Sequence, residues 1–206
     1  MRRDFSPCLV AFVVLLGLVL GLFASAPSHA KVFASQNQAL AEAFPDATRI
    51  ERSTRVLRAE EVERIETLIR DEVESKIIVL HEAYKNDELL GHAHIDVHNV
   101  RTQPEAFMVV LAPSGVVRSV RVLAFHEPLD YLPTDRWYAQ FEGKSKQDRL
   151  RVGHDVHGVV GATLSARAAS DGVRRMLAYW EVLLKTSEDS PPAEDASSAV
   201  GSPEAP

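Results

Sequence analysis

Apolar residues recur at three- and four-residue spacing in several stretches, which predicts amphipathic helices there. The clearest helix is expected from Arg58 to Glu74, and the last from Ala166 to Lys185. Shorter helices are expected from Ser35 to Phe44, capped by Ser35 and ended by Pro45, and from Pro133 to Phe141. The core faces of the two long helices are expected to hold Val62, Ile65, Leu68, Ile69 and Val73 in the first, and Val173, Met176, Leu177, Trp180 and Leu184 in the second.

Between these long helices the pattern changes to runs typical of β-strands. The runs are Lys76 to Leu80, Leu89 to Val97, Phe107 to Leu111 and Val116 to Ala124. Turn signals separate them, and short connections favour antiparallel pairing. We therefore predict an α+β fold, with an antiparallel sheet of about four strands flanked by helices.

The two ends of the chain differ in composition from the middle. Arg2 and Arg3 precede an apolar stretch from Cys8 to Ala26, and small residues lead up to Ala30, which together indicate a secretory signal in residues 1–30. An uncleaved membrane anchor is the alternative, and either one predicts an exported protein, periplasmic or on the outer face of the cytoplasmic membrane. Residues 186–206 contain five acidic and no basic residues and are expected to be a disordered tail.

Composition excludes several classes of protein. The formal net charge is -6, and the chain lacks the basic stripe that a nucleic-acid surface requires. Its single cysteine, Cys8, lies in the N-terminal apolar stretch, so a disulfide framework, a cysteine-ligated metal site and a heme attached through paired cysteines are not expected. The remaining residues, 31–185, are expected to form one domain.

A glycine-containing bend comes just before the last predicted helix, at Gly161-Ala162-Thr163-Leu164-Ser165. Small residues here let a ligand approach the backbone, and Ser165 is a candidate N-cap. Free amides and the positive end of the helix dipole would then face Thr163, which predicts an anion site suited to phosphate. Taken by itself, this spacing is more often ordinary loop-to-helix chemistry.

These five residues, with Ala166-Arg167-Ala168 and Gly172-Val173-Arg174-Arg175 after them, resemble the signature of FMN-binding domains. The family includes the flavin-bearing C subunit of the sodium-pumping NADH:quinone reductase and the G subunit of the Rnf complex. In that family a threonine, matched here by Thr163, carries FMN through a phosphoester bond made by a flavin transferase. The resemblance extends from about Leu90 to Trp180 and implies an FMN-binding-domain-like fold with FMN as cofactor, contacted by Gly161, Ala162, Thr163, Leu164 and Ser165.

Two positions depart from that family pattern. Where the family usually has Asp six residues before the threonine and Ser or Thr three before it, this chain has His157 and Val160. The resemblance therefore leaves covalent and reversible FMN binding both open. His126, Glu127 and Lys144 also match family positions, and no role is assigned to them.

Histidines offer an alternative function. His92 and His94 alternate along a predicted strand and would share one face, as would His98 if the strand continued. Such a face could bind copper or zinc in a periplasmic metal-binding or assembly module. Solvated histidines on an exposed strand are the simpler expectation, so no metal ligands are assigned.

Other side chains with possible chemistry add little to these two alternatives. His126 and Glu127 could form an acid–base pair, but no catalytic nucleophile with an oriented base is evident. Trp137, Tyr138 and Phe141 could stack on a flavin, although their helical spacing favours core packing.

The sequence thus predicts an exported FMN-binding electron carrier rather than a substrate-converting enzyme, and no catalytic residues are assigned. Its expected partners are a redox protein or a membrane electron-transfer complex, and a flavin transferase if the flavin is covalent. A scaffold that keeps the fold without flavin is a third possibility.

Overall fold

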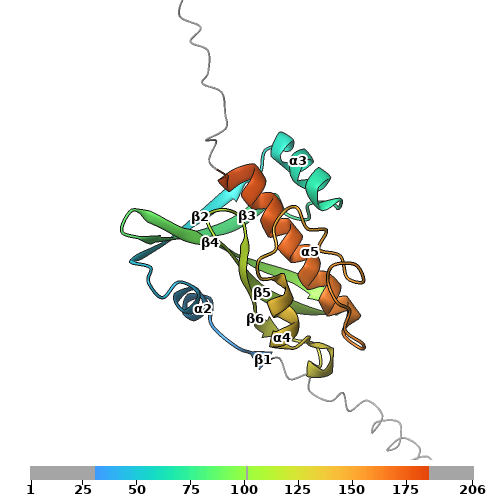
Figure 1. The fold of residues 1–206 in the computed structure, drawn as a ribbon. Helices are drawn as coiled ribbons and strands as arrows, with labels where there is room; N and C mark the ends of the chain where they lie inside the picture. Colours follow the sequence, from blue (N-terminus) through green and yellow to red (C-terminus); the bar gives the residue numbers. More distant parts are fainter. Residues whose placement is uncertain (1–30, 101, 186–206) are drawn as a thin grey trace, which may run out of the picture.

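A six-stranded antiparallel sheet forms the centre of the computed structural model, which describes residues 31–100 and 102–185 (Figure 1). The strand order is β1-β6-β5-β4-β3-β2, so β2 to β6 form a continuous meander and β1 pairs with β6. The strands are β1 (Lys31–Val32), β2 (Arg49–Val56), β3 (Ile77–Lys85), β4 (Glu88–Val100), β5 (Gln103–Leu111) and β6 (Val117–Phe125). The predicted α+β class and antiparallel pairing are confirmed.

The predicted number of about four strands is wrong, because both edge strands were missed. Strand β2 pairs with β3 along its whole length, from Arg49 opposite Tyr84 to Val56 opposite Ile77. It carries four charged side chains and is mostly exposed, as edge strands often are, so it lacks the apolar alternation that reveals a strand. Strand β1 has only two residues.

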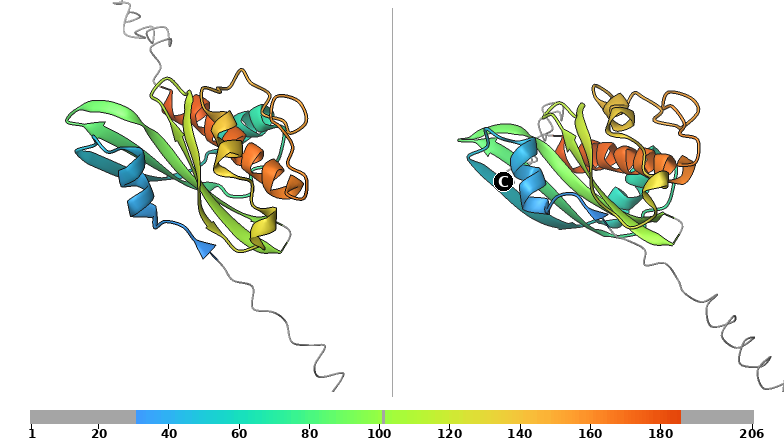
Figure 2. Two further views of the ribbon diagram at one scale, coloured as in Figure 1. Left: turned by 60° about the horizontal axis from the view of Figure 1, so that its bottom comes forward. Right: turned by 90° about the horizontal axis from the view of Figure 1, so that it is seen from below.

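Helices cover both faces of the sheet (Figures 1 and 2). Helix α2 (Gln36–Ala43) packs on one face, and Ser35 caps it as predicted by accepting from Gln38 N at 3.2 Å. The other face is covered by α3 (Ala59–Ile69), α4 (Asp135–Tyr138) and α5 (Thr163–Tyr179). The remaining helical turns are η1 (Leu129–Tyr131), η2 (Ala139–Phe141) and the π-helical turn η3 (Trp180–Leu184).

Helix α3 is shorter than its apolar pattern predicts. It ends at Ile69 because Arg70 adopts a left-handed conformation with φ 57° and its N–H bonds to Glu66 O. The helix buries Ile65 and Ile69, but the side chain of Leu68 is 48% exposed. Leu68 was predicted to face the core, so that expectation is wrong.

Helix α5 lies unusually close to the sheet at Gly172. A Cβ at this position would lie 2.2 Å from Phe107 Cζ and 2.7 Å from Asp96 Oδ2, so only glycine fits. One turn further along, Arg175 bonds both carboxylate oxygens of Asp96, from Nη2 at 2.6 Å and from Nε at 3.2 Å. A charged pair therefore joins the helix to the sheet just beside the closest contact.

The predicted signal segment in residues 1–30 and the predicted tail in residues 186–206 lie outside the described residues. Within the described part of the chain, no helix combines the length and apolar character that crossing a bilayer requires.

We expect Gly172→Ala to lower the free energy of unfolding by about 2 kcal/mol, because the buried Phe107 ring cannot move aside without cost. Helix propensity alone predicts the opposite sign, a gain of up to about 1 kcal/mol. Urea denaturation monitored by circular dichroism measures the difference. Gly158→Ala is the matched control, since its Cβ would meet only Val152 Cγ1 at 3.7 Å. Equal stability of Gly172→Ala and the wild type would contradict the steric argument.

Candidate functional site

Hydrogen bonds at Asp155 and His157 hold the loop that leads to Thr163 in place. Asp155 accepts hydrogen bonds from Leu150 N at 2.8 Å and from Arg151 N at 2.9 Å, which closes the first part of the loop on itself. Further on, His157 O accepts from Trp137 Nε1 at 2.7 Å, and His157 N donates to Gln140 Oε1 at the same distance. The segment after His157 therefore starts from a fixed position against α4 and η2.

The bend before α5 presents Thr163 to solvent. Gly161 has φ 85°, a left-handed conformation that L side chains rarely adopt, and no atom lies within 4 Å of where its Cβ would be. Ala162 N donates to Val159 O at 3.2 Å, and α5 begins at the next residue. The exposed Thr163 donates its hydroxyl proton to Val159 O at 3.3 Å. The hydroxyl thus lies at the surface beside open space.

The predicted N-cap at Ser165 is wrong. Ala162 occupies the N-cap position and has no side-chain hydrogen bond, while Ser165 is the third residue of the helix. Ser165 is 1% exposed, and its Oγ is buried without a hydrogen-bond partner. A hydroxyl residue near the start of a helix is a capping signal, and both Thr163 and Ser165 fit it. The packing of α5 on the sheet turns Ser165 inward.

The aromatic residues of α4 and η2 pack in the core, as the sequence favoured. Trp137, Tyr138 and Phe141 are all buried, and the Trp137 ring meets the other two edge to face at centroid distances of 5.0 and 5.3 Å. Their buried faces are therefore not available for stacking on a ligand.

His92, His94 and His98 lie on the face of β4 that α5 covers, so the expectation of an exposed, solvated histidine face is wrong. His94 donates from Nδ1 to Val79 O at 2.8 Å and meets the Tyr179 ring edge to face at 5.3 Å. Burial lowers the pKa of His92 and of His94. Among the described residues, no group of three or more His, Cys, Asp and Glu side chains is placed to hold a metal ion.

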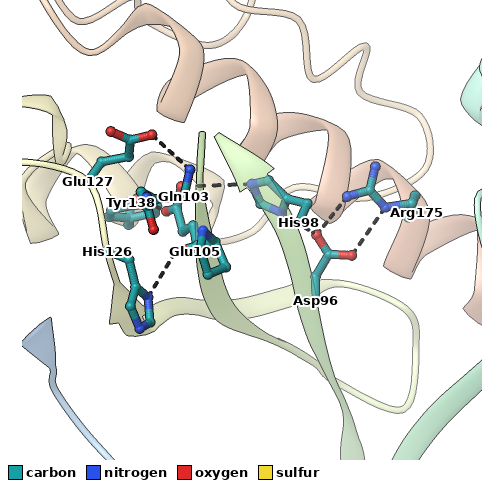
Figure 3. A network of polar contacts seen from close by, with 9 residues as sticks. Asp96, His98, Gln103, Glu105, His126, Glu127, Tyr138 and Arg175 are labelled. Atoms are coloured by element: carbon teal, nitrogen blue, oxygen red, sulfur yellow. Dashed lines mark hydrogen bonds and ion pairs between the residues drawn. The ribbon is translucent and has the colours of Figure 1, made fainter. Parts of the chain in front are cut away.

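A buried polar network runs beneath α5, and the sequence analysis missed it (Figure 3). Asp96 lies between the ion pair from Arg175 and a hydrogen bond from His98 Nδ1 at 3.0 Å. Burial alone would raise the pKa of Asp96, but its bonds to His98 and Arg175 outweigh burial and hold that pKa well below its usual value. Asp96 is therefore ionised inside the core.

Glu105 lies near the Asp96–Arg175 pair, but among the described residues no arginine or lysine side chain contacts it. It is fully buried, Tyr138 donates its hydroxyl to Glu105 Oε1 at 3.2 Å, and His98 Nε2 lies 3.8 Å from Glu105 Oε2. Burial raises the pKa of Glu105 to about 7, although His98 and Tyr138 act in the opposite direction. Near neutral pH this carboxyl group therefore exists in both protonation states.

Three other positions singled out by the sequence have structural contacts. Glu127 Oε1 accepts from the backbone N–H of Thr102 at 3.0 Å and of Gln103 at 3.1 Å, which holds the β4–β5 turn. His126 Nδ1 donates to Pro104 O at 3.0 Å. Lys144 Nζ lies 3.4 Å from Asp148 Oδ1. His126 and Glu127 thus contact backbone groups of the neighbouring hairpin.

Comparison with known proteins finds no family model and no curated protein that matches this chain. Of the five predicted cofactor contacts, Gly161, Thr163 and Leu164 are exposed, while Ala162 and Ser165 are buried.

The pKa of Glu105 predicts a pH-dependent effect of Glu105→Gln. Between its ordinary value of 4.5 and the folded value of about 7, the native protein binds a proton that the unfolded chain releases. The free energy of unfolding of the wild type therefore loses about 3 kcal/mol from this group as pH rises through that window. We expect Glu105→Gln to match the wild type near pH 4.5 and to exceed it by about 3 kcal/mol at pH 8.

Denaturation at several pH values measures this difference. Buried histidines such as His94 titrate in both proteins and largely cancel when the two are subtracted. Glu63→Gln, at an exposed position on α3, is the control for the loss of one carboxylate. A difference between Glu105→Gln and the wild type that does not change with pH would contradict the prediction.

Proposed function

We propose that this protein is an exported electron carrier that binds FMN, with the flavin phosphate held at Thr163. The observation that carries the proposal is the surface position of the Thr163 hydroxyl, in the first turn of α5 and next to the open space at Gly161. A phosphate group can approach this corner without displacing a side chain.

The chemistry of the corner fits a phosphate. The N–H groups in the first turn of a helix have no acceptor within the helix, and they point toward the helix start together with the positive end of the dipole. At α5 the first regular bond runs from Ala166 N to Ala162 O, which leaves the amides of Thr163 and Leu164 for a ligand. Arg167 follows Thr163 by one turn on the same helix face, is exposed, and has no ion pair within the described residues.

The flanking side chains suit the flat ring of a flavin. Val160 is fully exposed, and Leu164 is 44% exposed, so two apolar side chains border Thr163 at the surface. Apolar groups in such positions gain free energy when a ring covers them, at roughly 25 cal/mol per Å². Bound flavin would supply one- and two-electron redox chemistry, while the protein holds its position and tunes its electrostatics.

An exposed site favours a covalent link. The surface position of Thr163 gives little enclosure, and an exported protein would lose a weakly bound cofactor by dilution. Ester formation would replace the Thr163 Oγ1–H bond with an Oγ1–P bond and release the group that the flavin donor carries on its phosphate. This step needs a flavin transferase and an activated flavin nucleotide. The electron donor and acceptor would be a redox protein or a membrane complex.

The test is the visible spectrum of the full chain, expressed in a host that exports it and has a flavin transferase. We expect a visible flavin absorption band, on the order of one flavin per chain, that stays with the protein after acid denaturation. Thr163→Val should abolish this band, because the variant keeps the shape of the side chain but lacks the hydroxyl. Thr163→Ser should retain it.

Ser165→Ala is the matched control for the hydroxyl. Ser165 is buried and cannot accept a phosphate without unfolding the first turn, so this variant should load flavin as the wild type does. Covalent flavin on Thr163→Val would overturn the assignment of the residue. If the wild type loses its flavin on denaturation, binding is reversible, and Arg167→Gln should then weaken FMN affinity about fivefold. A wild type that neither carries nor binds FMN would overturn the proposed function.

A further inference from the structure

We propose that a second site, in a cavity between α3, α5 and the loop over residues 146–154, binds a small organic anion with a phosphate-like group and an apolar ring. The cavity has a volume of about 520 Å³, within the range of pockets that hold small molecules and large enough for a mononucleotide. This inference does not rest on the proposed flavin at Thr163.

The lining of the cavity carries an excess of positive charge. The cavity is lined by five cationic side chains, Arg70, Lys146, Arg149, Arg151 and Arg174, and by only two carboxylates, Asp148 and Glu181. The protein as a whole has a formal net charge of -6, so this positive excess is local. Like charges that converge on one cavity repel one another, and an anion bound among them relieves that repulsion.

Three of these five cations have no ion pair in the part of the chain that the structure describes. Lys146 pairs with Glu181 at 2.7 Å, and Arg174 pairs with Asp171 at 2.5 Å. The guanidinium groups of Arg70, Arg149 and Arg151 have no ion pair or hydrogen bond within residues 31–100 and 102–185. Arg174 Nε is also buried without a hydrogen-bond partner. Donor groups therefore remain for a ligand.

Apolar side chains also line the cavity. Leu150, Leu177 and Ala178 are among them, and all three are buried. Leu68 lines it too, although its side chain is 48% exposed and its neighbour Ile69 is buried in the core. An apolar ring that contacts Leu68 would remove this surface from water. A lining that combines cationic and apolar side chains matches a ligand that has a charged end and a ring.

The arginines indicate which chemical groups could form the charged end of the ligand. Its planar guanidinium bonds phosphate or carboxylate oxygens in pairs, which lysine cannot do, and four of the five cations here are arginines. The cavity is also separate from Thr163, because Arg174 lies eleven residues further along α5, or about 16 Å at 1.5 Å per residue. The lining thus fits a ligand with a phosphate-like group and an apolar ring, bound beside the second half of α5.

Isothermal titration calorimetry of the full chain at low salt tests the proposal with three probes: phenyl phosphate, inorganic phosphate and phenol. We expect a saturable site for phenyl phosphate in the Thr163→Val variant as in the wild type, about tenfold tighter than for inorganic phosphate because the ring adds apolar contact. Phenol, which lacks the charge, should show no measurable binding.

Variants at exposed positions assign the site without disturbing the core. The double variant Arg149→Gln, Arg151→Gln should weaken both phosphate probes about tenfold, since each removed guanidinium takes away charge-assisted hydrogen bonds. Leu68→Ser should weaken phenyl phosphate about fivefold and leave inorganic phosphate unchanged. Arg64→Gln, an exposed arginine on α3 outside the cavity, is the matched control and should change nothing.

The proposal is overturned if phenyl phosphate shows no saturable binding up to millimolar concentrations, or if the double variant binds it as the wild type does. Equal weakening of both phosphates by Leu68→Ser would also overturn the predicted place of the ring. Thermal denaturation of each variant confirms that it is folded. Thr163→Val should bind phenyl phosphate normally, so failure of the flavin assignment and failure of this one are distinguishable.

Discussion

The close packing of α5 on the sheet, at Gly172 and at the Asp96–Arg175 ion pair, is the constraint on which the rest of the structure depends. At Gly172 the backbone comes so near Phe107 and Asp96 that no side chain fits between them. The ion pair compensates for placing a carboxylate under a helix, since both Asp96 oxygens receive hydrogen bonds from Arg175. Together these contacts fix the distance of α5 from the sheet and its position along the sheet. They therefore also fix the positions of both ends of its outer face.

The same packing gives two buried carboxyl groups opposite properties. Asp96 bonds a guanidinium whose charge does not titrate, so it stays ionised. Glu105 receives a neutral hydroxyl from Tyr138, and burial dominates its pKa. Tyr138 belongs to the same short helix as Trp137, which holds His157 and the loop before Thr163. Tyr138, which contacts the buried Glu105, and Trp137, which holds the surface loop, are therefore neighbours in α4.

The sequence predicts a helix or strand well where neighbouring elements bury its apolar residues, and poorly where the element is exposed. Apolar runs typical of β-strands identified the four inner strands, because their burial leaves a clear signal. Strand β2 gave none, since an exposed edge strand can carry charges along most of its length. The two-residue period of a strand also placed His94 and His98 correctly on one face, but it could not show that α5 covers that face. Asp96 lies between them on the same face, and its partner Arg175 is 79 residues away, beyond the reach of local spacing.

The start of α5 illustrates the same limit at the candidate site. A bend followed by two hydroxyl residues indicated a helix start, but which hydroxyl faces outward depends on the rotation of the helix about its axis. Contacts at Gly172 and Arg175 set that rotation, and they bury Ser165 while exposing Thr163. The residues that face away from the sheet then include Thr163 near one end and Arg174 toward the other. The contacts at Gly172 and Arg175 therefore determine which residues of α5 face outward, where they can bind a ligand.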